Sequence, residues 1–249
     1  LVDTKKDESI LPSRYSYYDV GRLGKIKDQG IYGTCWAFAS LTAVETSLMP
    51  EEKYDFSEDN MVWNSGYFGA QYDGGDYTRA ISYLASWRGP VLEEDDVYGD
   101  GINNPDAGVV KHVQEAQIIE SKNLEAVKKA VFLYGGVESS LYTSMSYAGE
   151  RSMYYNDKNY SYCYIGTKKP NHDVVIIGWD DNYPSSNFNT QLEGDGAFIC
   201  QNSWGSDFGE DGIFYVSYYD TNIGTHNVVY TRVDDTDNYD KIYQSDLWQ

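Results

Sequence analysis

The spacing of hydrophobic residues predicts helices in the first half of the chain. Between residues 35 and 48, apolar side chains recur every three or four positions, which places them on one face of a helix. Ser57 is followed by two acidic residues, a pattern typical of a helix N-terminus. Similar stripes predict helices over 76–88 and 123–134, each ended by glycine.

After residue 135 the pattern changes to short β-branched and aromatic runs separated by Gly, Asn, Asp and Ser. The predicted strands cover 136–143, 173–179, 197–201, 212–219 and 227–233. The chain is therefore expected to have an α+β fold, with a helical lobe facing a lobe of mostly antiparallel sheet. A cleft between two such lobes is a preferred place for a substrate site.

We expect one domain over residues 12–249, with a helical lobe of about 12–134 and a β lobe of about 135–233. Residues 1–11 are polar and unpatterned, which favours a flexible lead-in or the remnant of a pro-segment. Residues 234–249 are expected to form a C-terminal tail. The Asp-rich stretch 234–240 could hold calcium, but it lacks the glycine and final glutamate of an EF-hand loop, so a solvated tail is favoured.

Composition narrows the possible partners. The 249 residues are 41% hydrophobic and 23% charged, as in globular proteins, and the net charge is −20. That charge repels phosphate backbones and anionic lipid surfaces, so we expect no nucleic acid partner. No apolar run is long enough to span a membrane. The 25 tyrosines could form a wet binding surface or fill half-buried positions.

Four residues could together perform acyl transfer. Cys35 opens a helix, where free backbone N–H groups and the helix dipole stabilise a thiolate. His172 begins a strand and could serve as its base, and Asn202, after a later strand, could orient the imidazole. Gln29 could add a side-chain N–H to the backbone N–H of Cys35 to form an oxyanion hole. Each residue alone also has an ordinary structural explanation; the set, in this order, points to chemistry.

Three segments resemble the signatures of the papain-like cysteine peptidases: QGIYGTCWAF at 29–38, NHDVVIIGW at 171–179 and QNSWG at 201–205. The resemblance covers nearly the whole chain. It implies a papain-like two-lobe fold, with Cys35 as nucleophile, His172 as base and acid, Asn202 as orienting residue and Gln29 in the oxyanion hole. It also implies a thiolate–imidazolium pair near neutral or mildly acidic pH. No metal or organic cofactor is expected.

The resemblance further implies a substrate site. Gly74 and Gly75 would bind extended substrate backbone, and Asp76 would either favour a basic side chain or cap the helix that follows. The residues expected to contact substrate are Gly74, Gly75, Asp76, Tyr77, Pro170, Asn171 and Trp204.

The chain departs from the family pattern at several positions. Tyr32 and Tyr72 stand where the family has two paired half-cystines, which suggests that aromatic packing replaces the bridge, and Asn64 replaces another. This pattern favours a bacterial member. Asp173 follows His172 and is expected to point away from it as a solvated carboxylate. Cys163 and Cys200 could form a bridge or remain free.

The sequence therefore predicts a cysteine endopeptidase, secreted or attached to the cell surface, that acts on protein or peptide substrates. An inhibitory pro-segment or a protein inhibitor is a possible partner. Two alternatives stay open: an amidase or transpeptidase that uses the same thioester, and a binding or adhesion module without catalysis.

Overall fold

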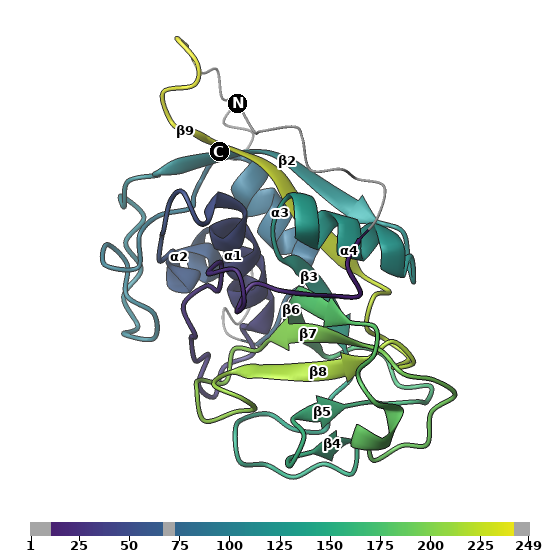
Figure 1. The fold of residues 1–249 in the computed structure, drawn as a ribbon. Helices are drawn as coiled ribbons and strands as arrows, with labels where there is room; N and C mark the ends of the chain where they lie inside the picture. Colours follow the sequence, from purple (N-terminus) through teal and green to yellow (C-terminus); the bar gives the residue numbers. More distant parts are fainter. Residues whose placement is uncertain (1–10, 67–72, 242–249) are drawn as a thin grey trace.

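The computed structural model of the chain describes residues 11–66 and 73–241 (Figure 1). The predictions made for residues 1–10, for Tyr72 and for residues 242–249 lie outside the described residues. The elements include helices α1 (Cys35–Leu48), α2 (Glu58–Asn64), α3 (Tyr77–Ala85) and α4 (Leu124–Leu133), and a 3-10 turn at Ser185–Asn187.

The predicted helix starts are confirmed, and three of them are closed by side chains. Ser57 accepts a hydrogen bond from the backbone N–H of the residue three positions later, and so does Asn123; Asp76 accepts one from Thr78. These short polar groups satisfy N–H donors that a helix leaves free in its first turn. The predicted helix over 76–88 is too long, because Trp87 adopts a positive φ of 55° and stacks on His112 instead of continuing the turn.

The strands form one sheet in the order β2-β9-β3-β6-β7-β8-β5-β4, with β1 paired to β6. Their bounds are β1 Arg14–Ser16, β2 Lys111–Ile119, β3 Val137–Leu141, β4 Tyr155–Asn156, β5 Ser161–Tyr162, β6 His172–Asp180, β7 Ala197–Gln201, β8 Ile213–Ser217 and β9 Asn227–Asp235. All described pairs are antiparallel except β5 with β8. The five predicted strands are confirmed.

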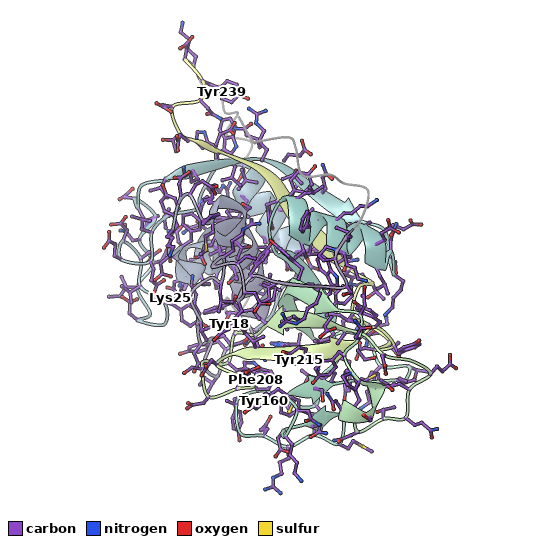
Figure 2. All side chains as sticks on the ribbon, viewed as in Figure 1. Tyr18, Lys25, Tyr160, Phe208, Tyr215 and Tyr239 are labelled. Carbon is purple, nitrogen blue, oxygen red and sulfur yellow. The ribbon has the colours of Figure 1, made fainter. Side chains whose placement is uncertain are left out.

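Two strands occupy the half that was expected to be helical. β1 pairs with β6, and β2 pairs with β9 at the edge of the sheet. Figure 1 accordingly shows the N-terminal segment crossing the sheet on its way to α1. Lys25 lies on this segment (Figure 2), where its carbonyl accepts a hydrogen bond from Gln201 of β7 at 2.9 Å.

α1 lies at the centre of the molecule. Every residue from Trp36 to Thr46 is buried, because the helix packs against β3, β6 and β9 as well as against α2 and α3. Most of its buried residues are apolar or small, and buried polar ones such as Ser40 and Glu45 have partners on neighbouring elements. The packing holds the first residue of α1, Cys35, beside the first residues of β6. The chain thus has the two-lobe α+β fold that the resemblance implied.

Candidate active site

The Cys35 sulfur lies at the N-terminus of α1, next to the start of β6. Thr34 makes no side-chain cap, and the first turn contains no acidic residue, so the positive end of the helix faces the thiol. Burial, then the charge of Asp173, raise the pKa of the Cys35 thiol to about 12, while the backbone N–H groups of Asp173 and Trp36 donate hydrogen bonds to the sulfur and oppose that rise.

The hydrogen bonds around Asn202 determine the tautomer of His172. The imidazole Nε2 lies 2.8 Å from Asn202 Oδ1, and the same oxygen accepts the backbone N–H of Ser203 at 2.8 Å. Because Oδ1 can only accept, Nε2 carries the proton, which leaves a lone pair on Nδ1. Nδ1 is thus the nitrogen that can receive the thiol proton.

Burial favours the neutral form of the imidazole. His172 is 5% exposed, and this burial lowers its pKa to about 4, although the hydrogen bond to Asn202 opposes the shift. No hydrogen bond joins the Cys35 sulfur to the His172 imidazole. The sulfur instead accepts a hydrogen bond from the backbone N–H of Asp173, the residue that follows His172. Burial therefore disfavours the charged forms of both the Cys35 thiol and the His172 imidazole, which opposes the expected ion pair.

Trp204 covers the hydrogen bond between His172 and Asn202. Its ring stacks on the imidazole at 4.7 Å between centroids, and Phe208 packs edge-on against Trp204 at 5.0 Å. This aromatic cover excludes water from the pair and restrains the imidazole ring.

Gln29 is held on three sides. Its Oε1 accepts a hydrogen bond from Ser203 Oγ at 2.7 Å, and its Nε2 donates to the carbonyl of Tyr32 at 2.7 Å. Its backbone N–H donates to the carbonyl of Ser203 at 2.8 Å. One N–H of the amide therefore has no acceptor among the described residues. Ser203, which the sequence analysis gave no role, determines which way the amide faces.

Tyr98 is a second residue that the sequence analysis missed. Its hydroxyl donates to the carbonyl of Gln29 at 2.8 Å and lies 2.7 Å from Thr34 Oγ1. Its ring packs edge-on against Tyr32 and Phe38. Tyr98 thus links both ends of the loop between Gln29 and Cys35, and its ring contacts Tyr32.

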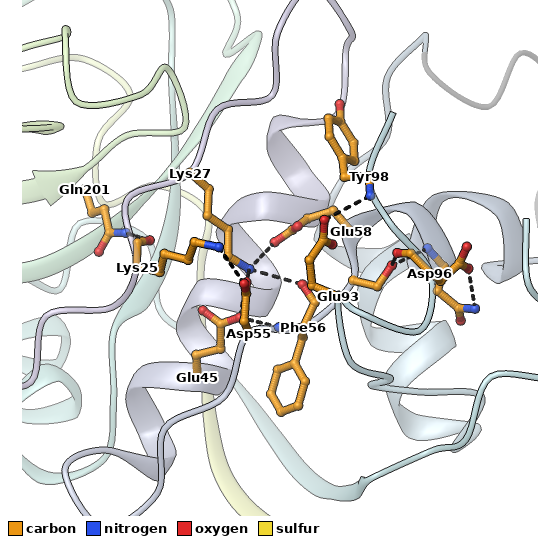
Figure 3. Close-up of polar contacts among 12 residues, drawn as sticks. Lys25, Lys27, Glu45, Asp55, Phe56, Glu58, Glu93, Asp96, Tyr98 and Gln201 are labelled. Carbon is orange, nitrogen blue, oxygen red and sulfur yellow. Dashed lines mark hydrogen bonds and ion pairs between the residues drawn. The ribbon is translucent and has the colours of Figure 1, made fainter. Parts of the chain in front are cut away.

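The strand-like segment before Gln29 is anchored by a buried lysine (Figure 3). The Lys27 side chain is 8% exposed, and Nζ lies 2.8 Å from Glu45 of α1 and 2.7 Å from Glu58 of α2. Burial lowers its pKa, but the two carboxylates raise it further, so the pKa lies well above the ordinary value. On the other side, the Lys27 carbonyl accepts the backbone N–H of Gly205 at 3.0 Å.

One residue of the predicted glycine pair, Gly75, packs against Trp36, the neighbour of Cys35. A Cβ placed on Gly75 would meet the Trp36 ring at 2.5 Å, so only glycine allows this approach. Asp76 caps α3, which confirms one of the two alternatives expected for it. Tyr77 follows as the first residue of that helix. Its ring lies 6.2 Å from that of His226.

Asn171 and its neighbour Pro170 lie just before β6. The Asn171 side chain bonds both the N–H and the carbonyl of Thr143, at 2.8 and 2.9 Å, so it joins two loops of the β lobe. These bonds occupy its amide group. Pro170 is half-buried beside it.

The expectation that Asp173 is solvated is wrong. The residue is 9% exposed, and its Oδ1 accepts a hydrogen bond from Ser140 Oγ at 2.6 Å. The reason is the position of α1, which packs over this face of β3 and β6 and whose Ser40 donates to Glu138 at 2.6 Å. Burial raises the pKa of Asp173 to about 6; the Ser140 bond opposes this rise and the charge of Asp76 adds to it.

The proposed bridge between Cys163 and Cys200 is absent, because all three cysteines are free. Both residues are buried among core side chains. Within residues 11–66 and 73–241, no group of three or more His, Cys, Asp or Glu side chains could hold a metal ion. No helix in this described part is long and apolar enough to cross a membrane.

Comparison with known proteins gives matches along nearly the whole chain. Residues 11–233 match the model for "Papain family cysteine protease". The structure of the Clostridial cysteine protease Cwp84 after propeptide cleavage is similar, with a TM-score of 0.82 and 31% identity over 94% of this chain and 61% of that one.

A second structure contains the cysteine protease and lectin-like domains of Cwp84, described as a surface layer associated protein of Clostridium difficile. It has a TM-score of 0.79 and 30% identity over 92% of this chain and 53% of that one. Falcipain-3 of Plasmodium falciparum is 29% identical over 197 residues, which are 77% of this chain and 38% of that protein. The chain therefore spans less than two thirds of each of these relatives.

Proposed function

Because the chain belongs to the papain family of cysteine proteases, we propose that it hydrolyses internal peptide bonds through a thioester on Cys35. Residues 12–249 would then form a single peptidase domain. The observation that carries the proposal is the pair of hydrogen bonds on Asn202 Oδ1, which leaves Nδ1 of His172 free to accept a proton, while the backbone N–H of the next residue, Asp173, donates to the Cys35 sulfur.

The first half-reaction would begin from the neutral pair. A substrate in the site excludes water, and His172 Nδ1 takes the thiol proton while the Cys35 sulfur bonds to the carbonyl carbon. The negative charge that develops on the carbonyl oxygen would be met by the free N–H of Gln29 and by the backbone N–H of Cys35. His172 then gives its proton to the leaving amine as the carbon–nitrogen bond breaks, and a thioester remains.

The second half-reaction would use water in place of the amine. His172 Nδ1 removes a proton from a water molecule as its oxygen attacks the thioester carbonyl. The carbon–sulfur bond breaks, the acid leaves, and the proton returns to Cys35. The Asn202 bond and the Trp204 ring keep the imidazole in one orientation through both steps.

Mass spectrometry of a diverse peptide library tests this proposal. We expect cleavage by the wild type and by Cys163→Ala, a control that removes a buried thiol, and none by Cys35→Ala. Cleavage by the Cys35→Ala variant would show that Cys35 is not the nucleophile. Accumulation of amide products after addition of amine nucleophiles would favour transfer over hydrolysis, and a Cys35 thiol inert to an epoxide at pH 5–7 would favour a binding module.

Two features of the Cwp84 structures support finer proposals. One structure is described after propeptide cleavage, and we propose that a pro-segment likewise blocks the site of this protein before activation. Cwp84 is also described as associated with a surface layer, which supports a secreted or cell-surface location for this protein. Cell fractionation with an antibody to residues 11–66 would test the location.

A further inference from the structure

Two neighbouring loops, one of which leads to Cys35, carry exposed apolar side chains. Ile31 is 92% exposed, Val97 is 48% exposed and Tyr32 is 37% exposed. The ring of Tyr98, which follows Val97, contacts the Tyr32 ring at 6.3 Å between centroids, so the two loops lie against each other. Isolated exposed apolar residues are common, but a group of them on adjoining loops is typical of an interaction surface. Ile31, Tyr32 and Val97 are called the apolar surface below.

The second of these loops, residues 93–107, is fixed by a buried carboxylate. Asp96 is 3% exposed (Figure 3). Its Oδ2 accepts a hydrogen bond from the side chain of Asn60 in α2 at 2.8 Å, and its Oδ1 accepts the backbone N–H of Asn104 at 3.1 Å. Because these bonds hold the loop in one conformation, a partner that binds Val97 would lose little free energy in ordering it.

Exposed carboxylates flank Val97 along the same loop. Glu94, Asp95 and Asp100 are exposed, and none of them forms an ion pair with a residue that the structure describes. The sequence contains no lysine or arginine from position 89 to position 110. Like charges without a counter-charge repel one another, so a partner that brings positive charge would relieve this repulsion.

The charge of the chain narrows the choice of partner. The net charge is −20, so a second copy would approach the apolar surface with a charge of the same sign. Nucleic acids and anionic lipid surfaces are repelled for the same reason. A protein segment in which apolar side chains alternate with lysine or arginine matches both the apolar side chains and the carboxylates around them.

The apolar surface is connected to the proposed oxyanion hole. Gln29 Nε2 donates a hydrogen bond to the Tyr32 carbonyl at 2.7 Å, and the Gln29 carbonyl accepts one from the Tyr98 hydroxyl at 2.8 Å. A protein substrate attacked by Cys35 would therefore extend past these loops, whereas a peptide of a few residues would be too short to cover them. This position favours the substrate itself as the partner.

We propose that Ile31, Tyr32 and Val97 form a second contact site for protein substrates, which takes a segment of alternating apolar and cationic side chains remote from the scissile bond. The site lies on the loops before α1 and after α3, not at the start of α3 or of β6. Docking there would raise the effective concentration of the scissile bond at Cys35, which lowers KM and leaves kcat unchanged. This inference rests on the proposed peptidase function.

Binding without cleavage tests the contact directly. The probe is a fluorescein-labelled peptide of nine residues in which leucine alternates with lysine, and its binding to the Cys35→Ala variant is measured by fluorescence anisotropy. A peptide in which glutamate replaces lysine is the control probe. We expect the lysine peptide to bind about tenfold or more tightly than the glutamate peptide, and its Kd to rise with added salt because the carboxylates are exposed.

Variants in the Cys35→Ala background separate docking at this surface from attraction by the overall charge. Ile31→Ser, Val97→Ser and Asp95→Asn should each raise the Kd of the lysine peptide several-fold. Two controls make the same changes elsewhere: Ile118→Ser on β2, where the side chain is 65% exposed, and Asp237→Asn after β9. Both controls should leave the Kd unchanged.

Kinetics of the wild type tests the effect on catalysis. Two substrates share a core sequence that the peptide library shows to be cleaved, and one of them also carries the leucine–lysine segment, joined to either end of the core through a glycine–serine linker. Mass spectrometry measures cleavage of the core bond. We expect a several-fold lower KM and an unchanged kcat for one of the extended substrates. Ile31→Ser should remove this difference without changing kcat/KM for the short substrate.

The outcomes separate this inference from the proposed function. Equal KM for the short and the extended substrates, or a Kd that rises as much in Asp237→Asn as in Asp95→Asn, would overturn the inference alone. Absence of cleavage of every library peptide, together with a Cys35 thiol that an epoxide does not label, would overturn the peptidase function itself.

Discussion

Ser203 donates a hydrogen bond of 2.7 Å to Oε1 of Gln29, and its own backbone N–H bonds the Asn202 oxygen that holds His172. One turn of chain after β7 therefore orients both the proposed base and the amide of the proposed oxyanion hole. The relationship explains why neither group needs a charged partner: each is fixed by a neutral donor or acceptor that leaves the charge of the reaction on the reacting atoms.

Ser203→Ala should lower kcat with little change in KM. Without the Ser203 hydroxyl, the Gln29 amide can turn away from Cys35, so we expect a loss of about tenfold, against about a hundredfold for Gln29→Ala. Adding Ser203→Ala to Gln29→Ala should cost almost nothing more, because both act through one group. The rate of alkylation by iodoacetamide, which forms no oxyanion, should stay unchanged in the single variant. An additive double variant would contradict the assigned role.

Tyr98→Phe should loosen the loop between Gln29 and Cys35. The variant keeps the ring packing but loses the bonds to the Gln29 carbonyl and to Thr34, a change of about 1 kcal/mol for each bond. We expect a several-fold lower kcat and a lower melting temperature. Tyr147→Phe, at an exposed position, is the control. Full activity of Tyr98→Phe would show that the loop between Gln29 and Cys35 is rigid without this residue.

Features encoded by neighbouring residues were predictable from sequence. The start of α1 at Cys35, the bounds of β7 and the caps at Ser57 and Asn123 depend on local periodicity and on a few polar side chains. β2 was missed because it is an edge strand with charged and exposed positions, and its partner β9 lies more than a hundred residues later.

The environment of the site was less predictable than its residues. Strand alternation gives the face of Asp173 but not what covers that face, and α1 covers it. The burial that resulted changes the expected charge state of Cys35, His172 and Asp173. Tyr98 was missed for a similar reason, because it acts from a loop without periodic pattern through contacts distant in sequence.

The fall of kcat/KM at acidic pH should follow the protonation of His172. Burial lowers its pKa to about 4, so kcat/KM for an uncharged peptide should fall only as the pH drops toward 4, where a protonated imidazole cannot accept the thiol proton. The rate of Cys35 alkylation should fall over the same range. A limb near pH 6.5, the ordinary value for histidine, would contradict the burial seen here.

The same shift makes a prediction for stability. The folded imidazole stays neutral down to about pH 4, whereas the unfolded one binds a proton below about 6.5, so its contribution is full above pH 6.5 and is lost as pH falls to 4. His172→Gln should remove this loss, on the order of 3 kcal/mol, when urea unfolding is compared at pH 7 and pH 4. If the free energy of unfolding changed by the same amount between pH 7 and pH 4 in both proteins, the prediction would be refuted.

Lys27→Met should destabilise the fold in a pH-dependent way. Removal of the cation leaves Glu45 and Glu58 facing each other in the interior, and breaking a buried pair costs about 3–5 kcal/mol. Burial already raises the pKa of Glu58 to about 8 despite Lys27, so both carboxyls of the folded variant retain protons that the unfolded chain releases above about pH 4.5.

The penalty in Lys27→Met should therefore grow from pH 4.5 to pH 8 in urea unfolding curves and be smallest at acidic pH. Lys129→Met removes a lysine that is 46% exposed and paired with Glu125, and it should change the free energy of unfolding by about 0.5 kcal/mol or less at any pH. Because Lys27 anchors the segment that carries Gln29, kcat should fall together with stability in Lys27→Met and stay constant in the control. A variant that loses stability equally at pH 5 and pH 8 would mean that the two carboxylates are solvated once the lysine is gone.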